Sequence, residues 1–370
     1  MFLNPLAKLA LSALLLASPP RGVRAASEEN ELEGTSFAVE AKASVGFETN
    51  PFESSRAQEG DAFVESLLRV RLPLSASRAF AAMLNVTTRD YFRFTGIDEY
   101  GVRAGVIWQP VETEKSTVAF GVNLDFSRQR IYLEFQRRPD QARTGEGGGL
   151  EWRARTEVTD DLEAEWIGSV GYQVINAAQL NNLRATTRAE FIRSFSEDWK
   201  AKGGLDGNYE GYPHRPPDEQ ALPTNRGLQV LEGRGFIGLE RKLARTWTVE
   251  AELNSGANLD LSNGYYTAAV VAGSAELRWE PARWKIKLSA EPELLLFSKR
   301  PANLRNARRQ LRAGEYVFGA SVERALSKHI ALYLSEGLRL HRTNANEQRS
   351  DATLNSFLDD SVQAGLHISY

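Results

Sequence analysis

The chain has 370 residues, with 45 basic and 48 acidic side chains, a formal net charge of −3 and no cysteine. The near balance of charge excludes a generic binder of polyanions, and the lack of cysteine excludes disulfides, thiolate chemistry and a lipid anchor attached through cysteine. After the N-terminus no apolar stretch reaches about 18 residues. With a mean hydropathy of −0.39, the sequence offers no helix that would cross a membrane.

The first 25 residues have the pattern of a cleaved signal peptide. Lys8 supplies a positive start, residues 9–17 supply an apolar core, and Val23, Arg24 and Ala25 form a small-x-small cleavage site. The apolar core is too short for a transmembrane anchor, which needs about 20 residues. We therefore expect export, a short periplasmic segment at residues 26–35, and one domain at residues 36–370.

From residue 36 onward, apolar and polar side chains alternate. In residues 162–176, Leu162, Trp166 and Tyr172 share one face, whereas Glu163 and Glu165 share the other. A period of two is typical of a strand with one apolar and one polar face. About 16 such segments begin near Ser36, Ala62, Ala79, Glu99, Ser116, Gly149, Leu162, Asn182, Trp199, Leu228, Trp247, Tyr265, Trp284, Tyr316, Ile330 and Ser361.

The connections between these segments alternate in length. Short joints are expected at residues 74–78, 110–115, 159–161, 196–198, 243–245, 280–283 and 326–328. Longer polar segments are expected at residues 49–61, 137–148, 212–227, 300–315 and 343–359. Outer-membrane barrels pair short periplasmic turns with long external loops. The succession therefore predicts an even number of strands, with both termini on the periplasmic side.

Aromatic side chains gather beside these connections. The group comprises Trp152, Trp199, Trp247, Trp279, Trp284, Tyr265 and Tyr266. Amphipathic rings favour the boundary between membrane and water, so the group indicates aromatic girdles. The alternative is that aromatic residues simply favour strands.

The C-terminal residues 361–370 carry the most specific signal. Val362, Ala364, Leu366, Ile368 and the terminal Tyr370 form one apolar face. This pattern resembles the last strand by which bacterial outer-membrane proteins are recognised by the barrel-assembly machinery. We interpret Tyr370, Ile368 and Leu366 as that assembly signal. The predicted fold is all-β: a single transmembrane antiparallel up-and-down barrel of about 16 strands, with 14 or 18 left open.

The polar faces of the predicted strands carry charges of both signs. The candidates for the lining of the lumen are Glu65, Arg69, Arg71, Arg153, Arg155, Glu163, Glu165, Arg184, Arg188, Lys285, Lys287, Glu291 and Glu293. Unpaired ions are costly to bury in a dry interior, so this lining implies water or pairing across the lumen. A barrel of about 16 strands keeps an aqueous channel, so transport of a polar solute is the leading hypothesis. The alternative is that the charges only pair between neighbouring strands.

A basic cluster lies in the longer segment at residues 300–315. Its members are Arg300, Arg305, Arg308, Arg309 and Arg312, with no acidic residue between the first and the last. A cluster of one sign in an external loop would attract anionic solutes or sugars, or contact lipopolysaccharide phosphate at the cell surface. The sequence leaves both alternatives open.

The sequence shows no catalytic constellation. The four histidines, His214, His329, His341 and His367, are scattered, and no His-x-Ser pair or HExxH motif is present. Isolated histidines are far commoner than catalytic ones. We therefore expect no enzyme, no cofactor and no metal site.

A family resemblance rests on the opening segments. The run from Gly46 through Phe47, Glu48, Thr49, Asn50 and Pro51 to Phe52 is followed by Asp61, Ala62 and Phe63 and by a short turn at residues 72–78. These motifs resemble the opening of outer-membrane β-barrel porins of Gram-negative bacteria that are associated with exopolysaccharide export. The resemblance implies an envelope barrel that passes saccharide, and it supplies no catalytic residues.

We therefore expect a porin-like channel of the bacterial outer membrane, for passive or weakly selective passage of small polar solutes or saccharides. The alternative is a structural or assembly barrel of the envelope, linked to exopolysaccharide export. The expected partners are outer-membrane lipid and lipopolysaccharide, the barrel-assembly machinery and the solute, with no nucleic acid. The size is compatible with a homo-oligomer.

Overall fold

The computed structural model describes residues 36–51, 59–75, 79–129, 143–176, 181–214, 227–302, 309–345 and 356–370. The predicted signal peptide at residues 1–25 and the segment at residues 26–35 lie outside these ranges. The described ranges hold no helix long and apolar enough to span a bilayer.

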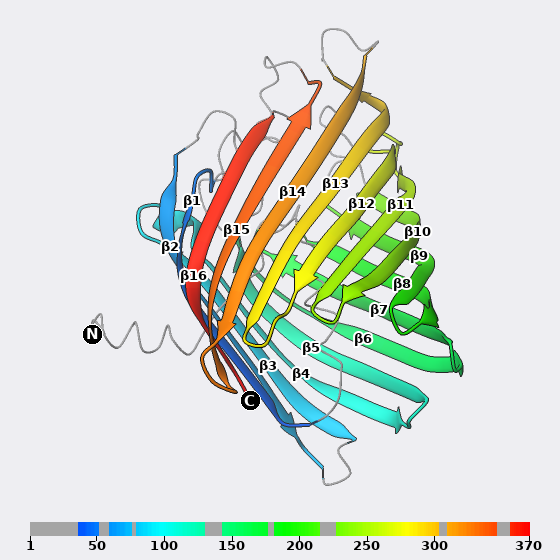
Figure 1. Ribbon diagram of the computed structural model, residues 1–370. Coiled ribbons are helices and arrows are strands. Elements are labelled where there is room, and N and C mark those ends of the chain that lie inside the picture. Colours follow the sequence, from blue (N-terminus) through cyan, green and yellow to red (C-terminus); the bar gives the residue numbers. More distant parts are fainter. Residues whose placement is uncertain are drawn as a thin grey trace.

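The described chain forms sixteen strands and one short 3-10 helix (Figure 1). The elements are β1 (Ala38–Glu48), β2 (Asp61–Pro73), β3 (Phe80–Tyr91), η1 (Thr95–Ile97), β4 (Glu99–Glu112), β5 (Ser116–Gln129), β6 (Arg143–Thr159), β7 (Leu162–Ile175), β8 (Asn182–Ser196), β9 (Trp199–Tyr212), β10 (Leu228–Ala244), β11 (Trp247–Asp260), β12 (Ala268–Trp279), β13 (Trp284–Pro301), β14 (Gln310–Ala325), β15 (Ile330–Thr343) and β16 (Phe357–Ser369).

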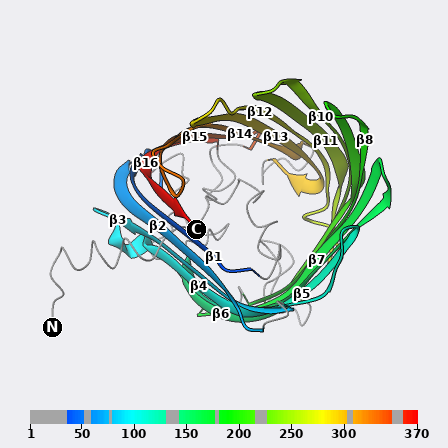
Figure 2. The same cartoon turned by 60° about the horizontal axis from the view of Figure 1, so that its bottom comes forward.

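The strands close into one antiparallel barrel. Each strand pairs with its neighbours in sequence, and β1 pairs with β16 to complete the ring (Figure 2). At the closing seam, Val39 and Tyr370 exchange backbone hydrogen bonds of 3.0 and 2.9 Å. Closure leaves no free sheet edge, which a barrel needs because lipid offers no partner for unpaired backbone groups. The predicted fold class, an up-and-down barrel of 16 strands, is confirmed.

The barrel has two different rims. The turn rim holds the connections at residues 113–115, 160–161, 197–198, 245–246, 280–283 and 326–329, and the described residues 74, 75 and 79 between β2 and β3. The loop rim holds the other ends of the strands, with the described connections at residues 92–98 and 261–267 and the described residues that flank the remaining connections, such as Asn50 and Asn344. Every predicted short joint falls at the turn rim, and both ends of the barrel domain lie there, as Figure 1 shows for the C-terminus.

Most strand starts agree with the alternation in the sequence. The starts predicted at Glu99, Ser116, Leu162, Asn182, Trp199, Leu228, Trp247, Trp284 and Ile330 coincide with the observed ones. Three starts were placed too late: the strands predicted from Gly149, Tyr316 and Ser361 begin at Arg143, Gln310 and Phe357. The start predicted at Tyr265 is too early, because Tyr265 lies in a turn and β12 begins at Ala268.

Two of the three late starts, those of β6 and β14, have a physical cause. In β6, the glycines between residues 145 and 149 have no side chains that could alternate, yet their backbones pair with β5 and β7. In β14, Arg312 occupies a position of the apolar face and so interrupts the pattern. The predicted loop at residues 300–315 is therefore too long, and the one predicted at residues 137–148 extends into β6.

One face of the sheet is apolar and exposed. Leu124, Leu205 and Ile237 are 71%, 68% and 67% exposed, and most of the other large exposed apolar side chains share their face. A continuous apolar surface of this extent is a binding surface, and around a closed barrel its ordinary partner is lipid. The tryptophans Trp199, Trp247, Trp279 and Trp284 lie on the same face at the turn rim, where Trp247 stacks on Trp279 at 5.4 Å.

Candidate functional site: the inner wall

Contacts between strands that are not neighbours identify the inner face. Arg234 on β10 contacts Glu293 on β13 at 2.7 Å, although β11 and β12 lie between them. Arg188 on β8 likewise contacts Glu252 on β11 at 3.4 Å. Side chains converge on the concave side of a barrel and diverge on the convex side, so these pairs lie inside. The opposite face, which carries the exposed apolar side chains, is the outer one.

The strand registers place all the predicted lumen candidates on this inner face. They comprise Glu65, Arg69, Arg71, Arg153, Arg155, Glu163, Glu165, Arg184, Arg188, Lys285, Lys287, Glu291 and Glu293. What the sequence could not give is the pairing of those candidates whose partners lie on strands distant along the chain, as with Arg188 and Glu252. The inner wall is built from ion pairs of three kinds.

The largest group is a continuous network that begins on β8. The guanidinium of Arg188 contacts Glu190 at 2.6 Å, Asp206 at 3.3 Å and Glu252 at 3.4 Å. Lys202 extends the network from Glu252, which its ammonium group contacts at 3.0 Å. Arg188 thus bridges carboxylates of three strands, and Lys202 on β9 contacts β11 across β10, so these ion pairs connect strands around the circumference of the barrel.

The same network continues to β13. Lys202 also contacts Glu250 at 2.5 Å, and Glu250 in turn contacts Arg278 at 3.3 Å. Arg278 contacts Glu276 at 2.9 Å, and Glu276 contacts Lys287. Charges of alternating sign therefore run along the inner wall from β8 to β13 without interruption.

Ladders between neighbouring strands line the wall at β6 and β7. Arg153 contacts Glu165 at 2.6 Å, and Arg155 contacts Glu163 at 2.7 Å. These four residues pair as the alternative interpretation of the sequence expects, between adjacent strands. The wall therefore combines local ladders with the longer network of β8 to β13.

A third group is buried near the loop rim of β1 to β3. Arg89 donates to Glu65 at 2.8 Å and lies 3.4 Å from Glu48, while the Tyr91 hydroxyl also bonds to Glu48. The guanidinium stacks 4.5 Å from the centre of the Phe63 ring. The side chains of Arg89, Glu48 and Glu65 are only 6%, 4% and 7% exposed. Two carboxylates that share one cation in a dry setting form a charge-assisted cluster.

Of this buried cluster, the sequence indicated only Glu65 as a candidate for the lining of the lumen. Arg89 lies opposite Glu65 in the register of β2 and β3, and Glu48 ends β1 on the same face. The alternation within each strand would have identified them, because residues next to the outward apolar positions face inward.

Two of the scattered histidines take part in the wall. His367 on β16 lies 3.2 Å from Glu323 on β14 and 3.5 Å from Glu40 on β1, so it bridges the closing seam. His341 lies 3.7 Å from Glu315. Within the described ranges, no three His, Asp or Glu side chains are grouped so that they could hold a metal ion.

The predicted basic cluster does not act as one unit. Arg300 belongs to β13, is 3% exposed, and stacks over the rings of Tyr265, Tyr266 and Phe297 at 5.5, 5.0 and 5.4 Å. Arg309 and Arg312 instead line a pocket at the start of β14. Arg305 and Arg308 lie outside the described residues.

A titratable group stands at the loop rim beside η1. Asp98 accepts a hydrogen bond of 2.9 Å from the backbone nitrogen of Tyr91. Burial raises the pKa of Asp98 to about 6, because it disfavours the charged carboxylate, and the nearby Asp90 adds to the effect. This carboxyl therefore changes its charge in the mildly acidic range.

No protein-family model matches the sequence, and no curated protein matches it. Among solved structures, the chain is similar to one titled "Bacterial polysaccharide outer membrane secretin", with 10% identity, a TM-score of 0.50, and coverage of 90% of this chain and 98% of that chain. It is also similar to OccAB1 of Acinetobacter baumannii, with 7% identity, a TM-score of 0.52, and coverage of 92% and 99%. The anion-selective porin from Comamonas acidovorans is 10% identical, with a TM-score of 0.45 and coverage of 90% and 98%.

The closed sixteen-stranded wall, apolar outside and charged inside, defines the class: an outer-membrane β-barrel with the fold of a porin-like channel. Within that class, the chain is structurally similar to outer-membrane porins and to a polysaccharide secretin barrel of the outer membrane.

Proposed function

We propose that the protein is a porin-like channel for passive or weakly selective passage of small polar solutes or saccharides. The observation that carries the proposal is the network from Arg188 to Lys287, which lines the inner wall with charge. Fixed charges of this density are costly in a dry interior, and a barrel of about 16 strands is too wide to be filled by its own wall. The lumen therefore holds water.

Weak selectivity follows from the pairing of the charges. Each cation of the network lies beside carboxylates, so the two signs alternate along this part of the wall. A strong filter needs an unbalanced ring of charge. The proposal includes no catalytic step.

The proposed location is the bacterial outer membrane, reached after removal of the signal peptide. The proposed assembly signal has the orientation that lipid-side recognition requires, because Leu366 and Tyr370 are 43% and 64% exposed and share the outer face with Ile368. The proposed partners are outer-membrane lipid and lipopolysaccharide, the barrel-assembly machinery and the permeating solute. A homo-oligomer of this chain is also proposed, and its oligomeric state is to be measured.

Conductance across a planar bilayer tests the proposal. The refolded protein should give stable open-channel current, and Arg188→Gln should shift the reversal potential in a salt gradient towards cation preference, because it leaves three carboxylates without that cation. The matched control is Arg324→Gln, which removes an arginine that stacks 5.1 Å from Trp284 on the outer face. It should leave the reversal potential unchanged. A folded protein without any open-channel current would sink the channel proposal.

A second candidate is a structural or assembly barrel of the envelope, linked to exopolysaccharide export. It is favoured by the structural similarity to the polysaccharide secretin barrel. At 10% sequence identity, that similarity concerns the fold alone. The two candidates differ in liposome swelling. Entry of neutral oligosaccharides supports a saccharide channel, whereas a barrel that excludes sugars and carries no current supports a structural role.

A further inference from the structure

Three arginines gather at the loop rim of β14 and β15. Arg309 and Arg312 stand at the start of β14, and Arg342 stands near the end of β15. The register pairs Arg312 with Leu296 and Arg342 with Gly314, which places both arginines on the outer face. We call Arg309, Arg312 and Arg342 the rim arginines.

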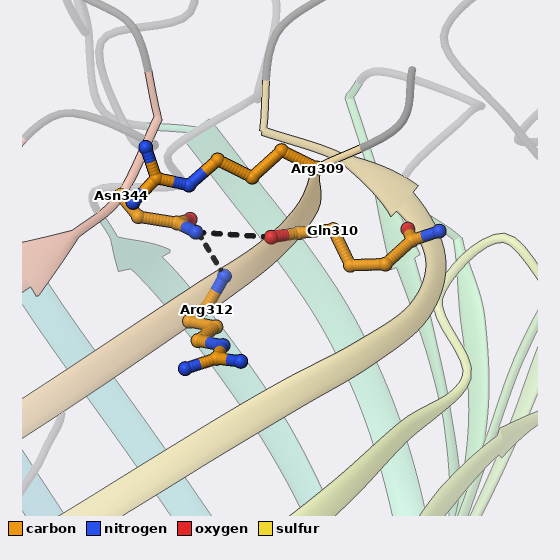
Figure 3. A pocket seen from close by; sticks show the side chains of 4 residues that line it. All are labelled: Arg309, Gln310, Arg312 and Asn344. Carbon is orange, nitrogen blue, oxygen red and sulfur yellow. Dashed lines mark hydrogen bonds between the residues drawn. The ribbon is translucent and has the colours of Figure 1, made fainter.

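The local backbone is fixed by an asparagine. The Asn344 side chain accepts from the Arg312 backbone nitrogen at 2.8 Å and donates to the Gln310 carbonyl at 3.0 Å. Figure 3 shows the side chains of Arg309 and Arg312 on either side of this amide. Together with Gln310 and Asn344, they line a pocket of about 580 Å³. Two arginine side chains thus line a space large enough for a ligand group, next to a backbone that Asn344 fixes.

The rim arginines differ from the arginines inside the barrel in their partners. Inside, Arg153 and Arg188 contact carboxylates at 2.6 Å. Throughout the described part of the chain, no carboxylate forms an ion pair with any of the three rim arginines. A cluster of exposed, uncompensated guanidinium groups attracts anions and offers planar pairs of donors that suit phosphate.

The position of the rim arginines on the barrel indicates which kind of anion they would meet. The outer face directly below the rim arginines is apolar, with Leu294, Leu340 and Leu358 in the neighbouring rows. Basic side chains immediately beyond an apolar band meet the head groups of the surrounding lipid. The loop rim is also the rim at which outer-membrane barrels meet the cell surface.

We propose that the rim arginines bind the phosphate groups of an outer-leaflet glycolipid of the lipopolysaccharide type. Arg312 and Arg342 contact the phosphate from the barrel wall, and Arg309 and Asn344 close the pocket from the loop side. The inference rests on the proposed membrane location, but it does not require that the barrel conduct.

Binding of purified lipid A to the refolded protein in neutral phosphatidylcholine vesicles tests the proposal. The double variant Arg312→Gln/Arg342→Gln should weaken binding on the order of tenfold or more, since each cation near a charged head group contributes about 1 kcal/mol. The control is Arg324→Gln, another outer-face arginine, which lies at the turn rim and should bind lipid A as the parent protein does. Heat-modifiable mobility in electrophoresis verifies that all variants fold.

Further arms separate the sources of phosphate. Lipid A without its phosphates should bind as weakly as the double variant, and inorganic phosphate should not displace intact lipid A. Equal binding of parent and double variant, or of intact and dephosphorylated lipid A, would overturn the proposal. Displacement by inorganic phosphate would contradict the lipid as the source. Conductance of the double variant in phosphatidylcholine stays at the parent level, so failure of lipid binding is distinguishable from failure of the channel proposal.

Discussion

Removal of Arg89 should destabilise the barrel more than removal of any exposed lumen charge. Arg89→Met takes the cation from between Glu48 and Glu65, whose side chains are 4% and 7% exposed. Breaking a buried pair by removing one partner costs about 3–5 kcal/mol, because the remaining charge is left without compensation. Here one substitution affects two carboxylates, so we expect a loss of unfolding free energy at the upper end of that range.

Urea unfolding of the refolded barrel in lipid vesicles, followed by tryptophan fluorescence, measures this loss. The matched control is Arg103→Met on the neighbouring strand β4, which removes contacts of 2.6 Å to Asp125 and 3.5 Å to Glu151, and Arg103 and Asp125 are 31% and 30% exposed. Such solvated pairs contribute about 0–1 kcal/mol. If Arg89→Met and Arg103→Met lower the unfolding free energy by the same amount, burial of the Arg89 cluster does not add to its contribution to stability. Glu65→Gln in the Arg89→Met background should recover part of the loss, because it removes one uncompensated charge.

Three other measurements follow from the structure. The Asp98 carboxyl binds its proton more tightly in the folded loop, so protection of residues 92–98 from hydrogen exchange should fall as pH rises from 4 to about 6, and Asp98→Asn should abolish this dependence. A Cβ at Gly256 would lie 1.9 Å from the Gly233 carbonyl oxygen, so Gly256→Ala should cost about 1–3 kcal/mol in urea unfolding, whereas Gly233→Ala, with nothing within 4 Å, should be tolerated. Because the chain has no cysteine, an impermeant maleimide on intact cells should label Asn263→Cys at the loop rim and spare Glu114→Cys at the turn rim. The reverse pattern would show that the barrel has the opposite orientation in the membrane.

The strands were predictable because lipid acts on each one separately. A strand such as β7 places Trp166 and Tyr172 towards lipid and Glu163 and Glu165 towards the lumen. That division is written in consecutive residues and needs no knowledge of the neighbouring strands. The short turns were predictable for the same local reason, since they interrupt the alternation over a few residues.

For the inner wall, the sequence could predict which residues face inward but not which of them contact one another. Parity identifies Arg234 and Glu293 as inward residues, but their contact joins β10 to β13 and depends on the curvature of the closed wall. The stacking of Arg300 on Tyr265 and Tyr266 is equally remote from sequence reasoning, because the tyrosines precede β12 and the arginine ends β13. The partner of each inward charge is therefore decided by the way the sheet closes into a barrel.

The arginines show how position decides the partner of one and the same side chain. Arg188 faces the lumen and is shared by carboxylates of different strands, whereas Arg324 faces outward at the turn rim and stacks on the aromatic ring of Trp284. Arg312 also faces outward, but at the loop rim, where the described residues offer it no carboxylate. The arginines of the inner network are thus paired within the protein, and under our proposal those at the outer loop rim are paired with lipid phosphate. Within the described residues, the basic run of the sequence therefore divides into the buried Arg300, which stacks on aromatic rings, and the exposed Arg309 and Arg312, which are part of the proposed lipid site.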